Sequence, residues 1–130
     1  MYSILVIDDE ESIRAALGRV LTPEGYAVAS AGTLTEGFAA CARNKPDLII
    51  LDVNLPDGYG VDLCRKIKAD PQLRHIPVFM LTGEAVEVEN RLKGLEAGAD
   101  DYILKPFTPS ELIFRVKRIL RDFPKKATPE

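Results

Sequence analysis

Several features that define common protein classes are scarce in this sequence. The 130 residues include two cysteines, Cys41 and Cys64, and a single histidine, His75. There is no CxxC pair and no Cys/His spacing typical of a zinc site, and one histidine in a predicted loop does not support a histidine-based catalytic triad. We expect both cysteines to be buried on helices as packing residues.

Long apolar runs and an excess of positive charge are also missing. No run approaches the roughly 20 residues of a membrane-spanning helix, and the first ten residues turn acidic too early for a secretory signal. Lys and Arg total 17 against 20 Asp and Glu, a net charge of −3, which argues against bulk electrostatic binding of nucleic acid. We therefore expect a cytoplasmic chain that itself contacts neither a membrane nor nucleic acid.

The composition suits one compact domain. Hydrophobic residues make up 46% of the chain, enough for a core without a disulfide or metal. We predict one domain over residues 1–123. Residues 124–130 are polar and contain proline, and they form either a free tail or the start of a linker to a domain that this chain lacks.

Short runs rich in Val and Ile alternate with segments of helical spacing. The clearest helical stripe follows the segment Thr108-Pro109-Ser110-Glu111, which is a capping box with proline at the first helical position. Five strands alternating with five helices predict an α/β fold, with a parallel sheet covered on both faces. The runs predicted as strands are Ser3–Ile7, Tyr26–Ala29, Leu48–Leu51, Val78–Leu81 and Tyr102–Leu104.

Polar residues follow four of these five strands. The first is followed by Asp8-Asp9-Glu10, the third by Asp52, the fourth by Thr82 and the fifth by Lys105. Each has an ordinary explanation as a helix cap, a turn residue or a solvated strand end. Because ligands of open parallel sheets bind beyond the carboxyl ends of the strands, their joint placement indicates a site.

The residue types at this edge suit phosphoryl chemistry. Carboxylates about 5 Å apart repel by about 3 kcal/mol per pair at an effective dielectric constant of about 20, and a hard cation such as Mg²⁺ relieves that repulsion. Lys105 and Thr82 offer a positive charge and a hydroxyl to phosphate oxygens. Asp52 stands alone on the central strand, so it is the best candidate for the nucleophile that forms an aspartyl phosphate.

Four segments in order resemble the receiver (CheY-like) domain of bacterial two-component response regulators. They are Ile4–Glu10, Pro46–Asp52, Met80–Gly83 and Gly94–Phe107. The resemblance implies a doubly wound, flavodoxin-like sheet of strand order 2-1-3-4-5 with five helices. It also implies a signalling domain that catalyses only its own phosphorylation and dephosphorylation, rather than an enzyme acting on another substrate.

The resemblance further implies a role for each site residue. Asp52 accepts the phosphoryl group from a partner histidine kinase, and Lys105 contacts that group beside a cis peptide bond to Pro106. Thr82 and Tyr102 then change position and reshape the surface of the fourth helix, fifth strand and fifth helix. Mg²⁺ is held by the carboxylates of Asp8, Asp9 and Asp52 and by the backbone carbonyl of Asn54.

A set of charges across that same surface is similar to the one through which receivers of the OmpR/PhoB subfamily form phosphorylation-dependent dimers. An ordinary solvated face explains the same charges. The interpretation as an interface predicts a homodimer. The residues are Arg91, Asp100, Asp101, Glu111, Arg115 and Lys117.

Three other functions fit parts of the pattern. A flavodoxin-like electron carrier is disfavoured, because the acidic loop after the first strand would repel the phosphate of FMN. A phosphatase of the haloacid dehalogenase type needs a second carboxylate two residues after its nucleophile, where this chain has Asn54. A pseudo-receiver that binds partners without phosphorylation stays open as the alternative, although no site residue is missing. The kinase, the signal and the output are not indicated.

Overall fold

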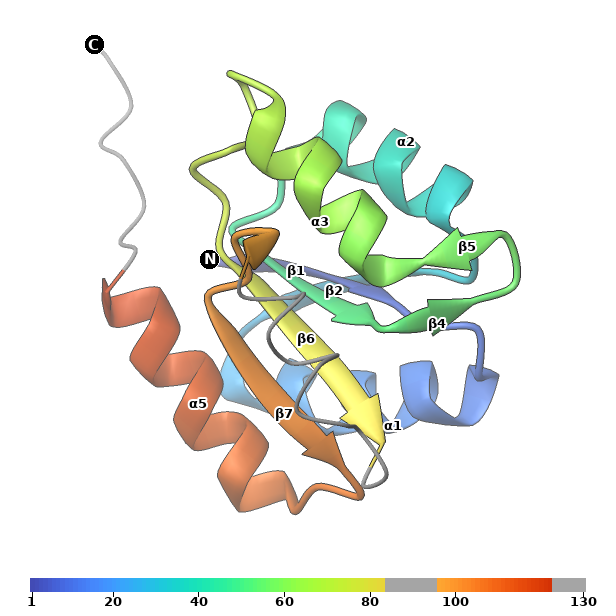
Figure 1. Ribbon diagram of the computed structural model, residues 1–130. Helices are drawn as coiled ribbons and strands as arrows, with labels where there is room; N and C mark the ends of the chain where they lie inside the picture. Colours follow the sequence, from blue (N-terminus) through green and yellow to red (C-terminus); the bar gives the residue numbers. More distant parts are fainter. Residues whose placement is uncertain (84–95, 123–130) are drawn as a thin grey trace, which may run out of the picture.

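The computed structural model describes residues 1–83 and 96–122 (Figure 1). The fourth predicted helix, with Arg91, and the predicted tail at residues 124–130 lie outside the described residues. The elements in chain order are β1 (Ser3–Ile7), α1 (Glu11–Leu21), the 3-10 helix η1 (Thr22–Glu24), β2 (Ala27–Ala31), α2 (Leu34–Asn44), β3 (Leu48–Asp52), β4 (Asn54–Leu55), β5 (Gly58–Tyr59), α3 (Gly60–Ala69), β6 (Val78–Gly83), β7 (Asp101–Lys105) and α5 (Pro109–Asp122).

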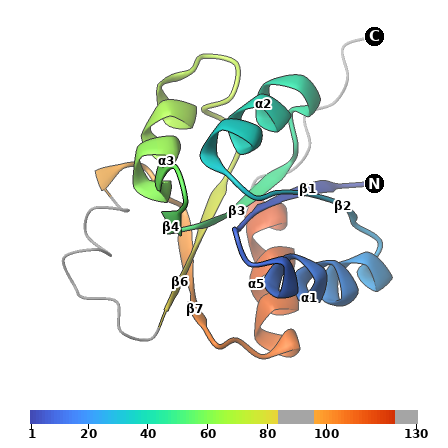
Figure 2. The ribbon, with the colours of Figure 1, turned by 90° about the vertical axis from the view of Figure 1, so that its right-hand side faces the viewer.

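Five strands form one parallel sheet in the order β2-β1-β3-β6-β7, which confirms the predicted order. The central strand β3 is buried along its whole length, as its uninterrupted apolar sequence predicts. Helices α2 and α3 cover one face of the sheet, and α1 and α5 cover the other (Figure 2).

The alternation of side chains along each strand divides the core into two layers. Ile4 and Val6 of β1 pack in the layer that contains the buried residues of α1 and α5, whereas Leu5 and Ile7 pack in the layer beneath α2 and α3. Cys41 and Cys64 are buried in this second layer. Burial raises the pKa of the Cys41 thiol to about 12 and that of the Cys64 thiol to about 11, so both thiols are protonated at neutral pH.

The strands differ from the predicted ones mainly at their ends. β3, β6 and β7 continue through Asp52, Thr82 and Lys105, because the hydrogen-bonded ladder extends past the last apolar residue. The antiparallel hairpin of β4 and β5 was not predicted, since strands of two residues are too short to show a period. The predicted cap of α5 is present, and the Glu111 N–H donates to Oγ1 of Thr108 at 3.1 Å.

The described parts of the chain contain no helix with both the length and the apolar character needed to span a membrane.

Candidate functional site

The acidic segment after β1 lies at the carboxyl edge of the sheet. Side-chain oxygen atoms of Asp8, Asp9 and Glu10 lie within 4.8 Å of one another. Asp8 is fully buried, its N–H donates to the carbonyl of Ala31, and its Oδ1 accepts from the N–H of Glu10 at 2.9 Å. The backbone around Asp8 therefore determines where its carboxylate lies.

Helix capping does not account for these carboxylates. The N-cap residue of α1 is Glu10, and it makes no side-chain capping hydrogen bond. Asp8 instead receives an additional contact from α1, because Nη1 of Arg14 donates to the Asp8 carbonyl at 2.6 Å. Arg14 was not among the predicted site residues, although a cation on the first turns of a helix that follows an acidic triplet was a signal for it.

Asp52 is the last residue of β3 and is buried beside Asp8. Burial, followed by the negative charge of Asp8, raises the pKa of Asp52 from 3.8 to about 6, while Lys105 and a hydrogen bond from the Asn54 N–H oppose the increase. That N–H donates to Oδ1 of Asp52 at 3.3 Å. Asp52 is therefore largely ionised at neutral pH, in an environment that disfavours its charge.

Lys105 ends β7 and lies between the carboxylates. Its Nζ is 3.0 Å from Oδ2 of Asp8, 3.5 Å from Oδ2 of Asp52 and 3.9 Å from Oε1 of Glu10. Burial on its own would lower the pKa of Lys105, but the surrounding carboxylates outweigh it and raise the pKa. The peptide bond from Lys105 to Pro106 is cis.

Two buried oxygen atoms at this edge have unused hydrogen-bonding capacity. Among the described residues, Oδ2 of Asp8 and Oγ1 of Thr82 are the buried side-chain oxygen atoms without a hydrogen bond. Oδ2 of Asp8 nevertheless lies 3.0 Å from the ammonium of Lys105, which compensates its charge. The hydroxyl of Thr82 has no such partner among the described residues, and because buried oxygen atoms normally find one, it points to a ligand. The carboxylate oxygen atoms fit a hard cation such as Mg²⁺, and the hydroxyl of Thr82 fits an anionic oxygen.

The backbone next to Asp52 leaves no room for a side chain at position 60, where the chain has Gly60. A Cβ atom on Gly60 would overlap the backbone oxygen of Asp52. The N–H of Gly60 donates to the carbonyl of Val53 at 2.7 Å, which closes the loop that follows Asp52. Only glycine allows this close approach without moving the backbone at Asp52.

The predicted interface charges on β7 and α5 have partners within the chain. Arg115 contacts Asp101 at 3.1 Å and Glu111 at 3.4 Å, and Lys117 contacts Glu24 at 2.9 Å. Arg115, Asp101 and Glu111 do lie together on one surface. Lys117 instead reaches Glu24, the last residue of η1.

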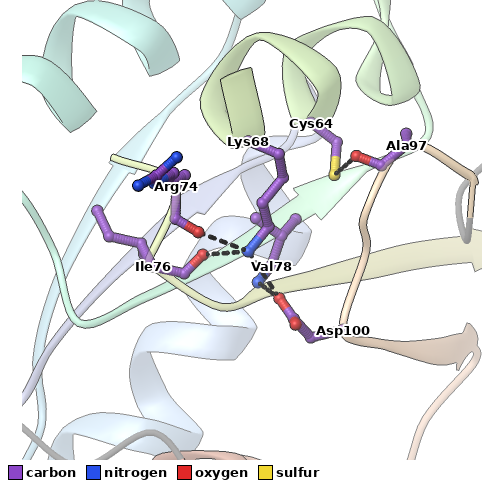
Figure 3. Close-up of polar contacts among 7 residues, drawn as sticks. All are labelled: Cys64, Lys68, Arg74, Ile76, Val78, Ala97 and Asp100. Carbon is purple, nitrogen blue, oxygen red and sulfur yellow. Dashed lines mark hydrogen bonds and ion pairs between the residues drawn. The ribbon is translucent and has the colours of Figure 1, made fainter. Parts of the chain in front are cut away.

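Asp100 lies beside Val78 at the beginning of β6 (Figure 3), whereas the acidic cluster follows the carboxyl end of β1. Its Oδ2 accepts from the N–H of Val78 at 2.8 Å and pairs with Nζ of Lys68 at 3.0 Å. Lys68 also donates to the carbonyl of Ile76 at 2.7 Å. The Asp100 carboxylate therefore joins α3 to the beginning of β6.

Tyr102 lies in β7, is half-buried and packs against the core beneath α2 and α3. It pairs in register with Met80 of β6, two residues before Thr82. The two predicted switch residues therefore lie on neighbouring strands.

The sheet order and the helices on both of its faces define a CheY-like α/β domain. The chain matches the family described as the response regulator receiver domain over residues 4–117. The chain therefore belongs to the receiver domains of two-component response regulators.

Relatives place the chain near the OmpR/PhoB subfamily. It is 44% identical over 119 residues to the phosphate regulon transcriptional regulatory protein PhoB of Pseudomonas aeruginosa, covering 92% of this chain and 52% of PhoB. It is 45% identical over 118 residues to the DNA-binding response regulator MtrA of Mycobacterium tuberculosis, covering 91% and 50%. The chain thus spans about half the length of these relatives.

A solved structure shows the same fold. The signal receiver domain of a signal transduction histidine kinase from Syntrophus aciditrophicus is similar to this chain with a TM-score of 0.89 and 33% identity, covering 100% of this chain and 98% of that one.

Proposed function

We propose that this chain is a phosphorylation switch in which Asp52 accepts a phosphoryl group from a histidine kinase. The observation that carries the proposal is the group of residues around Asp52. A buried carboxylate of raised pKa lies beside Asp8, within reach of Lys105, at an edge where the Thr82 hydroxyl has no hydrogen bond with any described residue.

The residues that would hold Mg²⁺ are Asp8, Asp9 and Asp52 through their carboxylates and Asn54 through its backbone carbonyl. The family generally binds Mg²⁺, and the acidic cluster supports such a site in this chain. When bound, Mg²⁺ supplies positive charge that offsets the repulsion among the carboxylates and the charge of the phosphoryl oxygens.

The chain's own residues account for the transfer. An ionised oxygen of Asp52 forms a bond to phosphorus while the bond from phosphorus to the kinase histidine nitrogen breaks, and the imidazole leaves with a proton from water. Lys105 balances the negative charge on the phosphoryl oxygens, and the Thr82 hydroxyl donates a hydrogen bond to one of them. Water later attacks the phosphorus atom, the bond from phosphorus to the Asp52 oxygen breaks, and inorganic phosphate leaves, which restores the carboxylate. In this proposal the domain catalyses both its own phosphorylation and its own dephosphorylation.

The surface next to the site provides the output. Phosphorylation draws Thr82 and Tyr102 toward the acceptor and changes the surface of β7 and α5, where Leu104 is 46% exposed and Phe114 is 62% exposed. This surface then binds a second copy of the chain or another partner. Arg115 would exchange its contact with Asp101 for a carboxylate on that partner.

The expected absence of nucleic-acid contact concerns residues 1–130 alone. The same expectation does not apply to full-length relatives, since MtrA, of which this chain covers 50%, is named as a DNA-binding response regulator. By likeness to it, we propose that DNA binding resides outside this chain, in a longer protein that acts in the cytoplasm.

The test is the intact mass of the chain after incubation with acetyl phosphate, with Mg²⁺ or with EDTA. One added phosphoryl group is expected on the wild type and on Asp62→Ala, which removes an exposed carboxylate of α3. None is expected on Asp52→Ala or in EDTA. If the wild type gains no phosphoryl group and binds no beryllofluoride, the proposal is wrong and the phosphorylation-independent pseudo-receiver becomes the better interpretation.

A further inference from the structure

The hairpin of β4 and β5 leads into helix α3 (Figure 1), and it follows β3, whose last residue is the candidate acceptor Asp52. It contains only two pairs, Asn54 with Tyr59 and Leu55 with Gly58. A two-stranded hairpin is marginally stable at best by itself in water. Contacts with the rest of the domain must therefore hold it in place.

Backbone hydrogen bonds hold the end of the hairpin that lies nearest the acceptor. The N–H of Val53 donates to the carbonyl of Leu81 at 3.1 Å, and the carbonyl of Val53 accepts from Gly60 at 2.7 Å. The Asn54 N–H then donates to Oδ1 of Asp52. A shift of the hairpin would therefore move backbone that contacts the acceptor carboxylate directly.

The carboxylate of Asp57 holds the opposite end. It accepts from the N–H of Leu34 at 2.8 Å, from the N–H of Thr35 at 3.1 Å and from Oγ1 of Thr35 at 3.0 Å. Leu34 and Thr35 are the first two residues of α2. Leu34 also closes over the turn, since its Cδ1 atom would lie 2.7 Å from a Cβ on Gly58.

The first turn of α2 needs this contact. The N–H of Glu36 binds the hydroxyl of Thr33, and the N–H of Gly37 makes the first hydrogen bond within the helix, to the carbonyl of Thr33. The N–H groups of Leu34 and Thr35 bind Asp57 instead, so the first three donors of the helix are divided between a local cap and a distant one. A carboxylate at the positive end of a helix is also favoured electrostatically.

We propose that Asp57 is a positioning residue for the acceptor site. By binding the first turn of α2, it holds the hairpin so that the backbone of Asn54 stays beside Asp52. The inference rests on the proposed function, in which the Asn54 carbonyl is a ligand of Mg²⁺. Groups that orient metal ligands from outside the coordination shell contribute strongly to metal affinity.

The test compares the Mg²⁺ affinity of the full chain and its variants by isothermal titration calorimetry, with folding checked by circular dichroism. Asp57→Ala is expected to weaken Mg²⁺ binding about tenfold. Asp57→Asn keeps one acceptor oxygen, so its Mg²⁺ affinity is expected to lie between that of Asp57→Ala and that of the wild type. Hydrogen exchange at the Asn54 amide, measured without metal, is expected to accelerate in Asp57→Ala.

Two control variants separate positioning from general destabilisation. Thr33→Ala removes the local cap of α2 but leaves the contacts of Asp57, and Asp62→Ala removes an equal charge from an exposed site on α3. Both are expected to bind Mg²⁺ as the wild type does. If Thr33→Ala loses as much Mg²⁺ affinity as Asp57→Ala does, fraying of α2 is sufficient to weaken Mg²⁺ binding, and the inference is overturned.

The remaining outcomes are also decisive. Wild-type affinity in Asp57→Ala would overturn the inference alone. If Asp57→Ala does not fold, Asp57→Asn decides, because weaker binding supports the inference and wild-type binding overturns it. Absence of both Mg²⁺ binding and phosphorylation in the wild type would overturn the proposed function, and this inference with it.

Discussion

Replacing Asp52 with Asn should stabilise the metal-free domain at neutral pH. The substitution keeps the size of the side chain but removes the charge that burial and Asp8 disfavour. In the folded protein, burial and then the charge of Asp8 raise the pKa of Asp52 from 3.8 to about 6, and Lys105 opposes this increase. Ionisation of Asp52 at neutral pH therefore reduces the free energy of unfolding.

The magnitude follows from the two pKa values. A difference of one in pKa corresponds to about 1.4 kcal/mol, so 3.8 in the unfolded chain and about 6 in the folded one give about 3 kcal/mol above pH 7. Because the pKa is higher in the folded state, the contribution of Asp52 to stability is fully present below pH 3.8 and is lost as the pH rises through about 6. The gain in free energy of unfolding from Asp52→Asn therefore grows as the pH rises from 3.8 to about 6.

The assay is urea unfolding in EDTA, followed by far-ultraviolet circular dichroism at pH 4 and pH 7.5. At pH 7.5 the midpoint of Asp52→Asn should lie about 1 to 2 M above that of the wild type, and at pH 4 the two should nearly coincide. Asp62→Asn, on an exposed turn of α3, should match the wild type at both pH values. A variant less stable than the wild type at pH 7.5, or an advantage independent of pH, would refute the reasoning.

Four further predictions test other parts of the site. Mg²⁺ at ten times its dissociation constant should raise the melting temperature by about 5 °C, and Asp9→Asn should lose most of this increase; a wild-type melting temperature indifferent to Mg²⁺ would contradict the metal site. Gly60→Ala should reduce the free energy of unfolding by about 3 kcal/mol through overlap with the Asp52 carbonyl, so an unchanged urea midpoint would argue against that contact. Thr82→Ala should change the free energy of unfolding by less than about 1 kcal/mol, since its hydroxyl has no hydrogen bond within residues 1–83 and 96–122, yet slow phosphorylation by acetyl phosphate at least about tenfold; an unchanged rate would remove Thr82 from the transfer step. Arg115→Glu places like charges beside Asp101 and Glu111 and should weaken the dimer of the phosphorylated chain in analytical ultracentrifugation, whereas equal dimerisation of wild type and variant would exclude this surface.

Local patterns in the sequence predicted much of the fold and the site. The apolar run at Leu48–Leu51 identified the central strand, because a strand covered on both faces shows no polar alternation. The polar residues that follow the strands could be assigned to one edge, because the carboxyl ends of parallel strands lie together. Thr108 and Glu111 likewise marked the start of α5, since a capping box involves only neighbouring residues.

Contacts between distant side chains could not be predicted in this way. Asp57 could be placed in a turn from the neighbouring Pro56 and Gly58, but its binding to the start of α2 depends on how the hairpin docks on the domain. The partners of Asp100 and Lys117 were missed for the same reason, and both residues were interpreted as interface charges.

The sequence by itself determined which segments form the five strands of the main sheet and which functional groups end them, because backbone propensity and apolar periodicity are local properties. Only the tertiary structure decided how those groups act on one another. The raised pKa of Asp52, the central place of Lys105 and the attachment of the hairpin through Asp57 all depend on burial and on distances between elements remote in the chain. Electrostatic energy varies with those distances and with exposure to water, and neither quantity is specified by any single segment.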